Sequence, residues 1–220
     1  MKSTWTAEQS SGITLAIMSF ALLLPPAEPL AAAPSTVVGG NDIIARATRD
    51  GAFDITFVDM THTIQQTCSL TGWNIWAQSY AATWPHSTAP RDLKLIIFRP
   101  DGLNLDVVGK SRFETVSEWD RAYHFDLATL IPVEAGDLIG WYFATAPVPG
   151  GVISYGGGSG VTRWTYGGEV FDSTPLSTFN WAESRVYSIN VEGTIPAPGA
   201  MLLGTLGAGM VGCLRRRRTL

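Results

Sequence analysis

The sequence predicts an all-β fold: an antiparallel β-sandwich of the jelly-roll kind, placed between an N-terminal signal helix and a C-terminal transmembrane helix. Three observations within residues 50–194 lead to this prediction. Short segments alternate apolar and polar residues, as strands with one buried face do. Clusters of Gly, Pro and Asp separate these segments at turns. No 11-residue window in this range has helical periodicity.

The N-terminal segment has the pattern of a secretory signal peptide. A charged start at Lys2 precedes an apolar run from Ile13 to Leu24, and small residues, Ala31-Ala32-Ala33, follow. The run is shorter than the roughly 20 residues that span a bilayer. We therefore expect residues 1–32 to be a signal helix that is cleaved after Ala31 or Ala32, with a retained N-terminal anchor as the alternative.

The C-terminal segment predicts a membrane span. Residues 199–214 carry no charge, and Arg215, Arg216, Arg217 and Arg218 follow directly. A helix of this length would be about 24 Å long, slightly short for a hydrocarbon core of about 30 Å. Because clustered arginines stay on the cytoplasmic side, we expect a cytoplasmic C-terminus and a domain outside the membrane.

The tail over residues 195–220 resembles the PEP-CTERM sorting signal. The resemblance rests on Pro196-Ala197-Pro198, the glycine-rich apolar stretch that begins at Gly199, and the arginine cluster. It implies an exported bacterial protein, from a group rich in exopolysaccharide producers, that an exosortase-type membrane enzyme processes near Pro196–Pro198. The family carries glutamate where this chain has Ala197, so a variant processing enzyme and a plain membrane anchor are both open.

Residues 34–194 then form one extracellular domain, in which the patterns predict a series of strands. In 122–127, Tyr123, Phe125 and Leu127 point inward, whereas His124 and Asp126 point outward. Segments 93–98 and 138–143 are apolar on both faces, which indicates central or doubly covered strands. The expected strands are 53–59 (with Phe53, Ile55 and Phe57 on one face), 72–80, 93–98, 122–127, 138–143, 161–166 and 185–191, with weaker candidates at 105–108 and 152–155.

Four turn-rich segments divide these strands: 99–102, 134–137, 147–151 and 156–160. We expect the last of them, Gly-Gly-Gly-Ser-Gly, to be a flexible connection. The segment 131–142 is similar to a turn-then-strand element of many extracellular jelly-rolls. An immunoglobulin-like sandwich is disfavoured because the sequence has no Cys…Trp…Cys framework.

Charge and cysteine content fit an exported domain. Residues 34–194 hold 10 Lys and Arg against 17 Asp and Glu, a net charge of −7. An acidic surface argues against a nucleic-acid partner, which would require basic patches. Cys68 is the one cysteine of this domain and Cys213 lies in the tail. We expect Cys68 to be a small buried apolar residue, with a free thiol for intermolecular pairing as the alternative.

The sequence contains no pattern that predicts an enzyme or a cofactor. His62, His86 and His124 do not have the spacing of a local metal site. Ser159 has Val161 where a nucleophile elbow requires glycine. We therefore expect a non-catalytic domain without a cofactor.

Two clusters of acidic residues leave a glycan hydrolase and a calcium site open as alternatives. Two carboxylates facing each other across a cleft could hydrolyse a glycan, and the candidates are Glu114, Glu118 and Asp120. Asp101, Asn104 and Asp106 offer oxygen ligands for calcium, although a solvated hairpin turn is the preferred explanation of these residues.

The most informative feature is the aromatic segment at residues 73–80. Alternation places Trp73, Ile75 and Ala77 on one face, which we assign to the core. Flat aromatics and amides on the opposite face suit sugar rings and their hydroxyls. The predicted ligand-binding residues are Asn74, Trp76, Gln78 and Tyr80, and Trp84, Trp119, Trp164 and Trp181 lie where they could join that face. Packing of these aromatics in both layers of the sandwich is the competing explanation, and it is the one that the general behaviour of large aromatics favours.

These patterns together predict an exported, surface-sorted bacterial protein with a non-catalytic, matrix- or glycan-binding sandwich. It would reside in the cell envelope, anchored in the membrane or released after processing, with an exosortase-type enzyme and polysaccharide as partners. The alternatives are a secreted glycan-acting hydrolase and a purely structural envelope protein.

Overall fold

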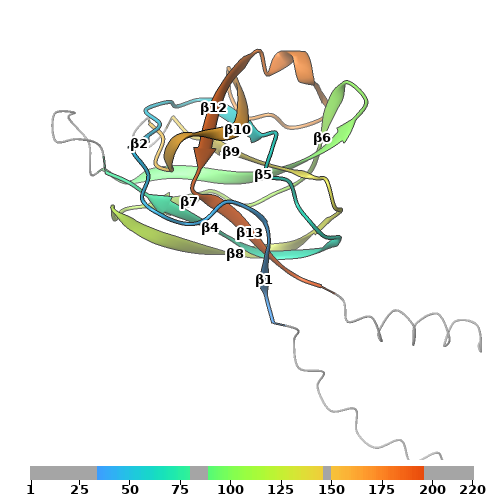
Figure 1. Ribbon diagram of the computed structural model, residues 1–220, viewed down its shortest axis with the longest axis horizontal. Helices are drawn as coiled ribbons and strands as arrows, with labels where there is room; N and C mark the ends of the chain where they lie inside the picture. The colour runs from blue at the N-terminus through green and yellow to red at the C-terminus, as the bar shows by residue number, and fades with distance from the viewer. Residues whose placement is uncertain (1–33, 80–88, 146–149, 196–220) are drawn as a thin grey trace, which may run out of the picture. The chain divides into compact units, whose positions relative to one another are not determined.

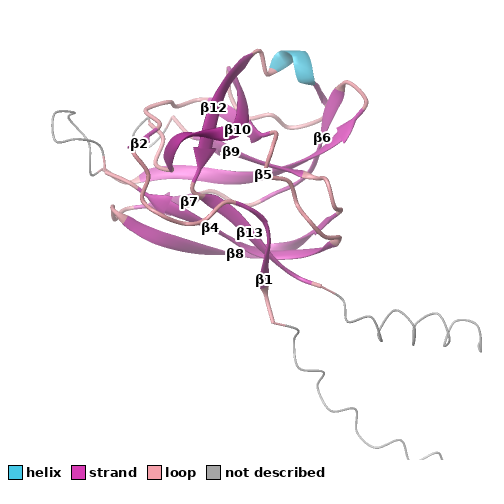
Figure 2. Ribbon diagram, viewed as in Figure 1, coloured by secondary structure: helices cyan, strands magenta, loops and turns pink. Residues whose placement is uncertain are grey.

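A computed structural model describes residues 34–79, 89–145 and 150–195 of the chain. These residues form an all-β domain in which every strand pairing is antiparallel, and Figures 1 and 2 show the strands as two layers. The smaller sheet has the order β1-β13-β4-β8. Its strands are β1 (Thr36–Gly40), β13 (Ile189–Thr194), β4 (Cys68–Ala77) and β8 (Arg121–Val133).

The larger sheet has the order β11-β6-β5-β9-β3-β10-β12, with β2 added to β10 and β7 added to β5. One 3₁₀ turn, Leu176–Thr178, is the only helical element of the described residues. The strands of this sheet are β2 (Thr48–Arg49), β3 (Ile55–Asp59), β5 (Arg91–Asp101), β6 (Asn104–Lys110), β7 (Glu114–Val116), β9 (Leu138–Phe143), β10 (Ser154–Tyr166), β11 (Thr174–Pro175) and β12 (Trp181–Tyr187).

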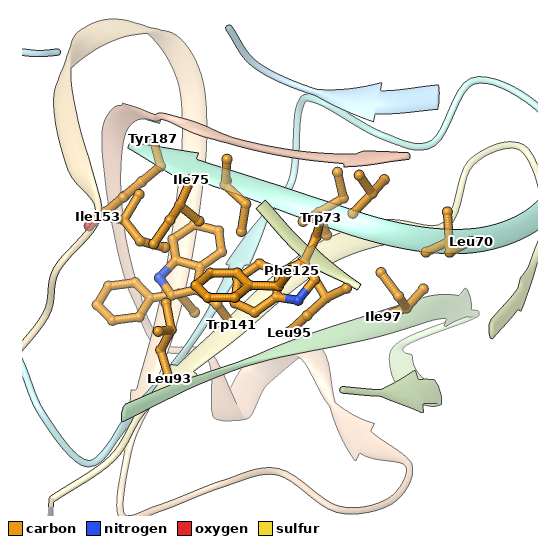
Figure 3. Close-up of a cluster of buried hydrophobic side chains, with 14 of the residues drawn as sticks. Leu70, Trp73, Ile75, Leu93, Leu95, Ile97, Phe125, Trp141, Ile153 and Tyr187 are labelled. Carbon is orange, nitrogen blue, oxygen red and sulfur yellow. The ribbon is translucent and has the colours of Figure 1, made fainter. Parts of the chain in front are cut away.

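The core lies between the two sheets, where inward-facing residues of both interdigitate (Figure 3). Trp73 and Phe125 come from the smaller sheet, and their ring centroids lie 4.7 Å apart. Trp141 of the larger sheet stacks on Phe57 with centroids 5.4 Å apart and also contacts Tyr187. Burial of such large apolar side chains is the main stabilising term of the sandwich.

A second apolar cluster covers the opposite face of the larger sheet. Residues 167–180 cross this face, and Phe179 is fully buried against Phe98. This layer explains why 93–98 and 138–143 are apolar on both faces. The prediction that these strands are central or doubly covered is confirmed.

The predicted strand 185–191 is wrong as a single element. The chain leaves the larger sheet at Tyr187 and enters the smaller sheet at Ile189. Ser188 makes the crossing: its backbone N–H donates to Ser154 O at 2.9 Å and its hydroxyl donates to Ile44 O at 2.7 Å. The alternation of apolar and polar residues continues from β12 into β13, so the sequence pattern did not reveal the crossing.

The glycine-rich segment 156–160 is not a connection but part of β10, so that prediction is wrong. Gly156 and Gly157 pair with Val186 and Arg185 of β12, and the register then shifts. Close neighbours favour glycine at two of these positions. A Cβ on Gly158 would lie 2.5 Å from Cγ2 of Val186, and one on Gly160 would lie 3.0 Å from the backbone O of Arg185.

Phe53 does not share the core face with Ile55 and Phe57. It precedes β3 and is 49% exposed, whereas the other two side chains are buried. Asp54 has a positive φ of 57°, which turns the chain just before the strand and breaks the alternation.

Several predictions concern residues outside the described ranges. These are the signal helix at 1–32, the turn residues 147–149, Pro196–Pro198, the membrane helix 199–214 and the arginines 215–218. Within residues 34–79, 89–145 and 150–195, no helix has the length and apolarity needed to cross a membrane.

Candidate functional site on the outer face of the smaller sheet

Strand β4 presents two chemically different faces. Trp73, Ile75 and Ala77 are fully buried in the core, so the predicted alternation is confirmed for these residues. Asn74 and Trp76 are half-buried and lie on the outer face of the sheet.

The outer face carries a hydrogen-bonded network centred on Asn74, because register places Asn190 and His124 on either side of it. Asn74 Nδ2 donates to Asn190 Oδ1 at 2.9 Å and to Glu192 Oε1 at 2.7 Å. Asn74 Oδ1 lies 2.9 Å from His124 Nδ1, and His124 Nε2 lies 3.1 Å from Asp126 Oδ1. The network thus fixes an amide, an imidazole and carboxylates side by side on one sheet surface.

Gly72 makes room for the imidazole in this network. It pairs with Asp126 on one side and Glu192 on the other. A Cβ at Gly72 would lie 2.9 Å from Cε1 of His124, so the ring lies directly over the glycine. The site therefore offers two flat groups, this imidazole and the indole of Trp76, on neighbouring rows of the sheet.

The four predicted binding residues do not all join this network. Gln78 follows β4, and its side-chain Oε1 accepts a hydrogen bond from the backbone N–H of Arg46 at 3.3 Å. Trp76 Nε1 is buried and donates to no described residue, so the indole offers its ring rather than its N–H. Tyr80 lies outside the described residues.

The other tryptophans do not extend this face. Trp164 is buried in the core and Trp181 is half-exposed on β12, both in the larger sheet. Trp119 packs against the core with the guanidinium of Arg49 4.8 Å from its ring. The prediction that these three could join the binding face is wrong, and Trp84 lies outside the described residues.

The carboxylates considered for hydrolysis are engaged elsewhere. Glu114 Oε1 accepts from Arg112 Nε at 2.8 Å, and Glu118 is paired with Arg121. Asp120 accepts from both the backbone N–H and the hydroxyl of Ser79, at 3.0 and 2.7 Å. Each of these carboxylates therefore has a hydrogen-bond or ion-pair partner among the described residues.

Asp101, Asn104 and Asp106 lie at the β5–β6 hairpin. Asp101 pairs with Asn104 across a tight turn that contains Gly102 at φ 59°. Among the residues that the structure describes, no group of three or more His, Cys, Asp or Glu side chains is arranged to hold a metal ion. The hairpin thus accounts for these residues as a turn.

Cys68 is buried in the core, and His62 is hydrogen-bonded to a buried carboxylate. Cys68 is a free, buried thiol, and burial raises its pKa, which disfavours the reactive thiolate. His62 Nδ1 lies 2.9 Å from Oδ2 of the buried Asp59, which also accepts from the backbone N–H groups of Thr61 and His62. His86 lies outside the described residues.

Sequence reasoning missed Asn190 and Glu192 as members of the site, and it placed His124 only as solvent-facing. These residues come from strands 50 to 118 positions away from Asn74. Only the pairing register brings them together. A signal was present, because Asn190 and Glu192 alternate with the buried Ile189 and Val191.

Comparison with known proteins gives no family for this chain. No family model matches the sequence, and no curated protein is significantly similar to it.

Proposed function

We propose that this chain is an exported bacterial surface protein whose sandwich binds glycan, without catalysis, through the outer face of the smaller sheet. The observation that carries the proposal is the Asn74 network beside Trp76. Amides and carboxylates held in fixed positions suit the hydroxyls of a sugar, and an aromatic ring suits its apolar face.

We also infer a jelly-roll topology. The order β1-β13-β4-β8 faces the order β3-β9-β5-β6, which is the strand arrangement of two interlocked Greek keys. In this reading the β10–β12 pair is an addition beyond β3. The jelly-roll scaffold is common to lectin domains, and this supports binding only by analogy of fold.

The proposed location in the cell envelope rests on the two ends of the sequence. The signal pattern in residues 1–32 and the PEP-CTERM-like tail in 195–220 point to export and to processing by an exosortase-type enzyme. Thr36 of β1 pairs with Gly193 of β13, so the described domain begins and ends on neighbouring strands. A tail retained after processing would attach the domain to the membrane through β13.

The proposal is tested by glycan binding of the full chain, purified in mild detergent, on an array of neutral and acidic polysaccharide fragments. We expect Trp76→Ala to weaken binding about fivefold to tenfold, because it removes a stacking surface worth about 1 to 1.4 kcal/mol. Leu103→Ala, at an 83% exposed hairpin tip, is the control and should bind like the parent.

Unchanged glycan binding by a folded Trp76→Ala variant would contradict binding at the outer face of the smaller sheet. The same incubations are assayed for new reducing ends. Their release by the parent chain would overturn the non-catalytic part of the proposal and favour the hydrolase. Absence of glycan binding altogether would favour a purely structural envelope role.

A further inference from the structure

Three large aromatic side chains are exposed together at one end of the larger sheet. Phe53 is 49%, Tyr166 59% and Trp181 53% exposed, whereas Trp73 and Trp141 in the core are fully buried. Single exposed apolar residues are ordinary, but adjacent exposed aromatics are a frequent feature of binding surfaces, and here Phe53 and Tyr166 line one hollow while Tyr166 and Trp181 are in contact.

Two of these rings form a corner. Tyr166 ends β10 and Trp181 begins β12, and their centroids lie 6.0 Å apart with the ring planes at 84°. Beside Tyr166 lies a hollow of about 340 Å³, within the size range of small-molecule sites. It is lined by Ala52, Phe53, Asp54, Ile55, Tyr166 and Gly167.

Asp54 is held rigidly at this hollow. Its φ of 57° is positive, which among the described non-glycine residues occurs only here and at Asp120. The backbone N–H of Asp54 donates to Phe143 O at 2.9 Å, and its carbonyl accepts from the N–H groups of Gly167 and Gly168 at 3.3 and 3.2 Å. Aspartate adopts this left-handed conformation more readily than most residues, and here these backbone hydrogen bonds hold it in place beside the hollow.

The carboxylate of Asp54 has one oxygen engaged. Tyr142 Oη donates to Oδ1 at 2.9 Å. Burial and the hydrogen bond to Asp54 raise the pKa of Tyr142 to about 12, so the phenol remains a donor at neutral pH. No described residue donates a hydrogen bond to Oδ2 of Asp54, a residue that lines the hollow, so this oxygen remains able to accept one.

We propose that the corner formed by Phe53, Tyr166 and Trp181 binds one neutral pyranose residue of a glycan. The C–H face of the sugar stacks on an aromatic ring, whose face is electron-rich, while a hydroxyl donates to Asp54 Oδ2. The Asp54 carboxylate and the domain charge of −7 repel uronic acids, which makes the site selective for neutral sugars. The choice of a glycan as the ligand rests on the proposed function. This second site, however, lies on the larger sheet, whereas the proposed function uses the smaller sheet.

The test measures affinity of the detergent-purified full chain for neutral hexasaccharides, namely β-1,4-glucan, β-1,3-glucan and mannan, and for oligogalacturonate. At least one neutral hexasaccharide should bind, and oligogalacturonate should bind at least about tenfold more weakly. Trp181→Ala and Tyr166→Ala should each weaken neutral binding about tenfold, and Asp54→Asn about threefold. Phe171→Ala, which removes a 65% exposed ring elsewhere, should retain the parent affinity.

The variants at Trp76 and at Trp181 separate the two sites. If Trp181→Ala loses affinity for the neutral hexasaccharide and Trp76→Ala does not, the corner is supported as the binding site. The same result contradicts binding at the outer face of the smaller sheet. Loss in Trp76→Ala alone overturns the corner and leaves the proposed function standing. The corner is also overturned if Phe171→Ala loses as much affinity as Trp181→Ala, or if the parent chain binds no neutral hexasaccharide. Thermal melting checks each fold, and Trp181→Phe, which keeps a ring and should retain binding, replaces any misfolded variant.

Discussion

Asp137 shows how a single residue joins a local turn to a distant strand. The turn before β9 was predicted at residues 134–137, and Gly136 within it has a positive φ of 97°. Asp137 Oδ2 accepts from the backbone N–H of Glu134 at 2.8 Å. The carboxylate also receives Arg99 Nε at 2.8 Å and Nη2 at 2.9 Å. This second role was not predictable, because Arg99 is 38 positions away.

Asp137→Asn should therefore destabilise the domain more than a surface ion pair would. Asp137 is 2% exposed and its partner Arg99 is 36% exposed, so screening lowers the expected loss to about 2 kcal/mol of unfolding free energy. Glu134→Gln is the matched control: Glu134 is 62% exposed, also pairs with Arg99, and should cost less than about 1 kcal/mol. Urea denaturation measures both, and equal small losses would contradict this view of the turn.

In the candidate functional site, too, contacts between residues far apart in the sequence could not be predicted. Period-two alternation is a local property, so the sequence could place Asn74 and Trp76 opposite Trp73. It could not supply His124 or Glu192, because their proximity to Asn74 depends on which strands pair and in which register. Corrections at Phe53 and at 156–160 have a similar origin, since a positive φ and close packing override the local pattern.

Among the elements, the cover over the outer face of the larger sheet depends on one buried carboxylate. Glu169 lies between two lysines, with Oε2 2.9 Å from Lys94 Nζ and Oε1 2.8 Å from Lys110 Nζ. Burial by itself would raise the pKa of Glu169, but the hydrogen bonds and attraction of Lys110 and Lys94 outweigh it and lower the pKa from 4.5. The segment 167–180 is thus held by charge as well as by Phe179.

A pH-dependent stability follows from Glu169. Because its pKa is lower in the folded than in the unfolded chain, its contribution is complete above about pH 4.5 and is lost as the pH falls through the folded value. The difference in unfolding free energy between the parent and Glu169→Gln should be widest at neutral pH and should narrow in acid. Urea titrations from pH 7 to 3 measure it, and a difference that grows in acid would contradict the assignment.

At the scale of the whole molecule, composition and pattern predicted the all-β class correctly, together with most of the long strands. The short strands β1, β2, β7 and β11 were missed because two to five residues carry too little periodicity. The crossing at Ser188 was also missed, since it depends on contacts with Ser154 and Ile44 from other parts of the chain. Sheet assignment is set by such long-range contacts.

The orientation of the molecule in the envelope is a prediction from the tail. Replacement of Arg215, Arg216, Arg217 and Arg218 by neutral residues should misorient or mislocalise the protein, because positive charge holds a segment on the cytoplasmic side. Protease accessibility in intact cells measures this, with a Lys-for-Arg variant as the charge-matched control. Normal surface display of the neutral variant would contradict the proposed topology.

Binding of glycan to the outer face of the smaller sheet can be measured residue by residue by NMR of the labelled full chain during titration with an oligosaccharide that binds it. We predict shifts of the side-chain amides of Asn74 and Asn190 and of the Trp76 indole, while the buried Trp73 indole stays unchanged. Saturating binding without shifts at these three groups would contradict it.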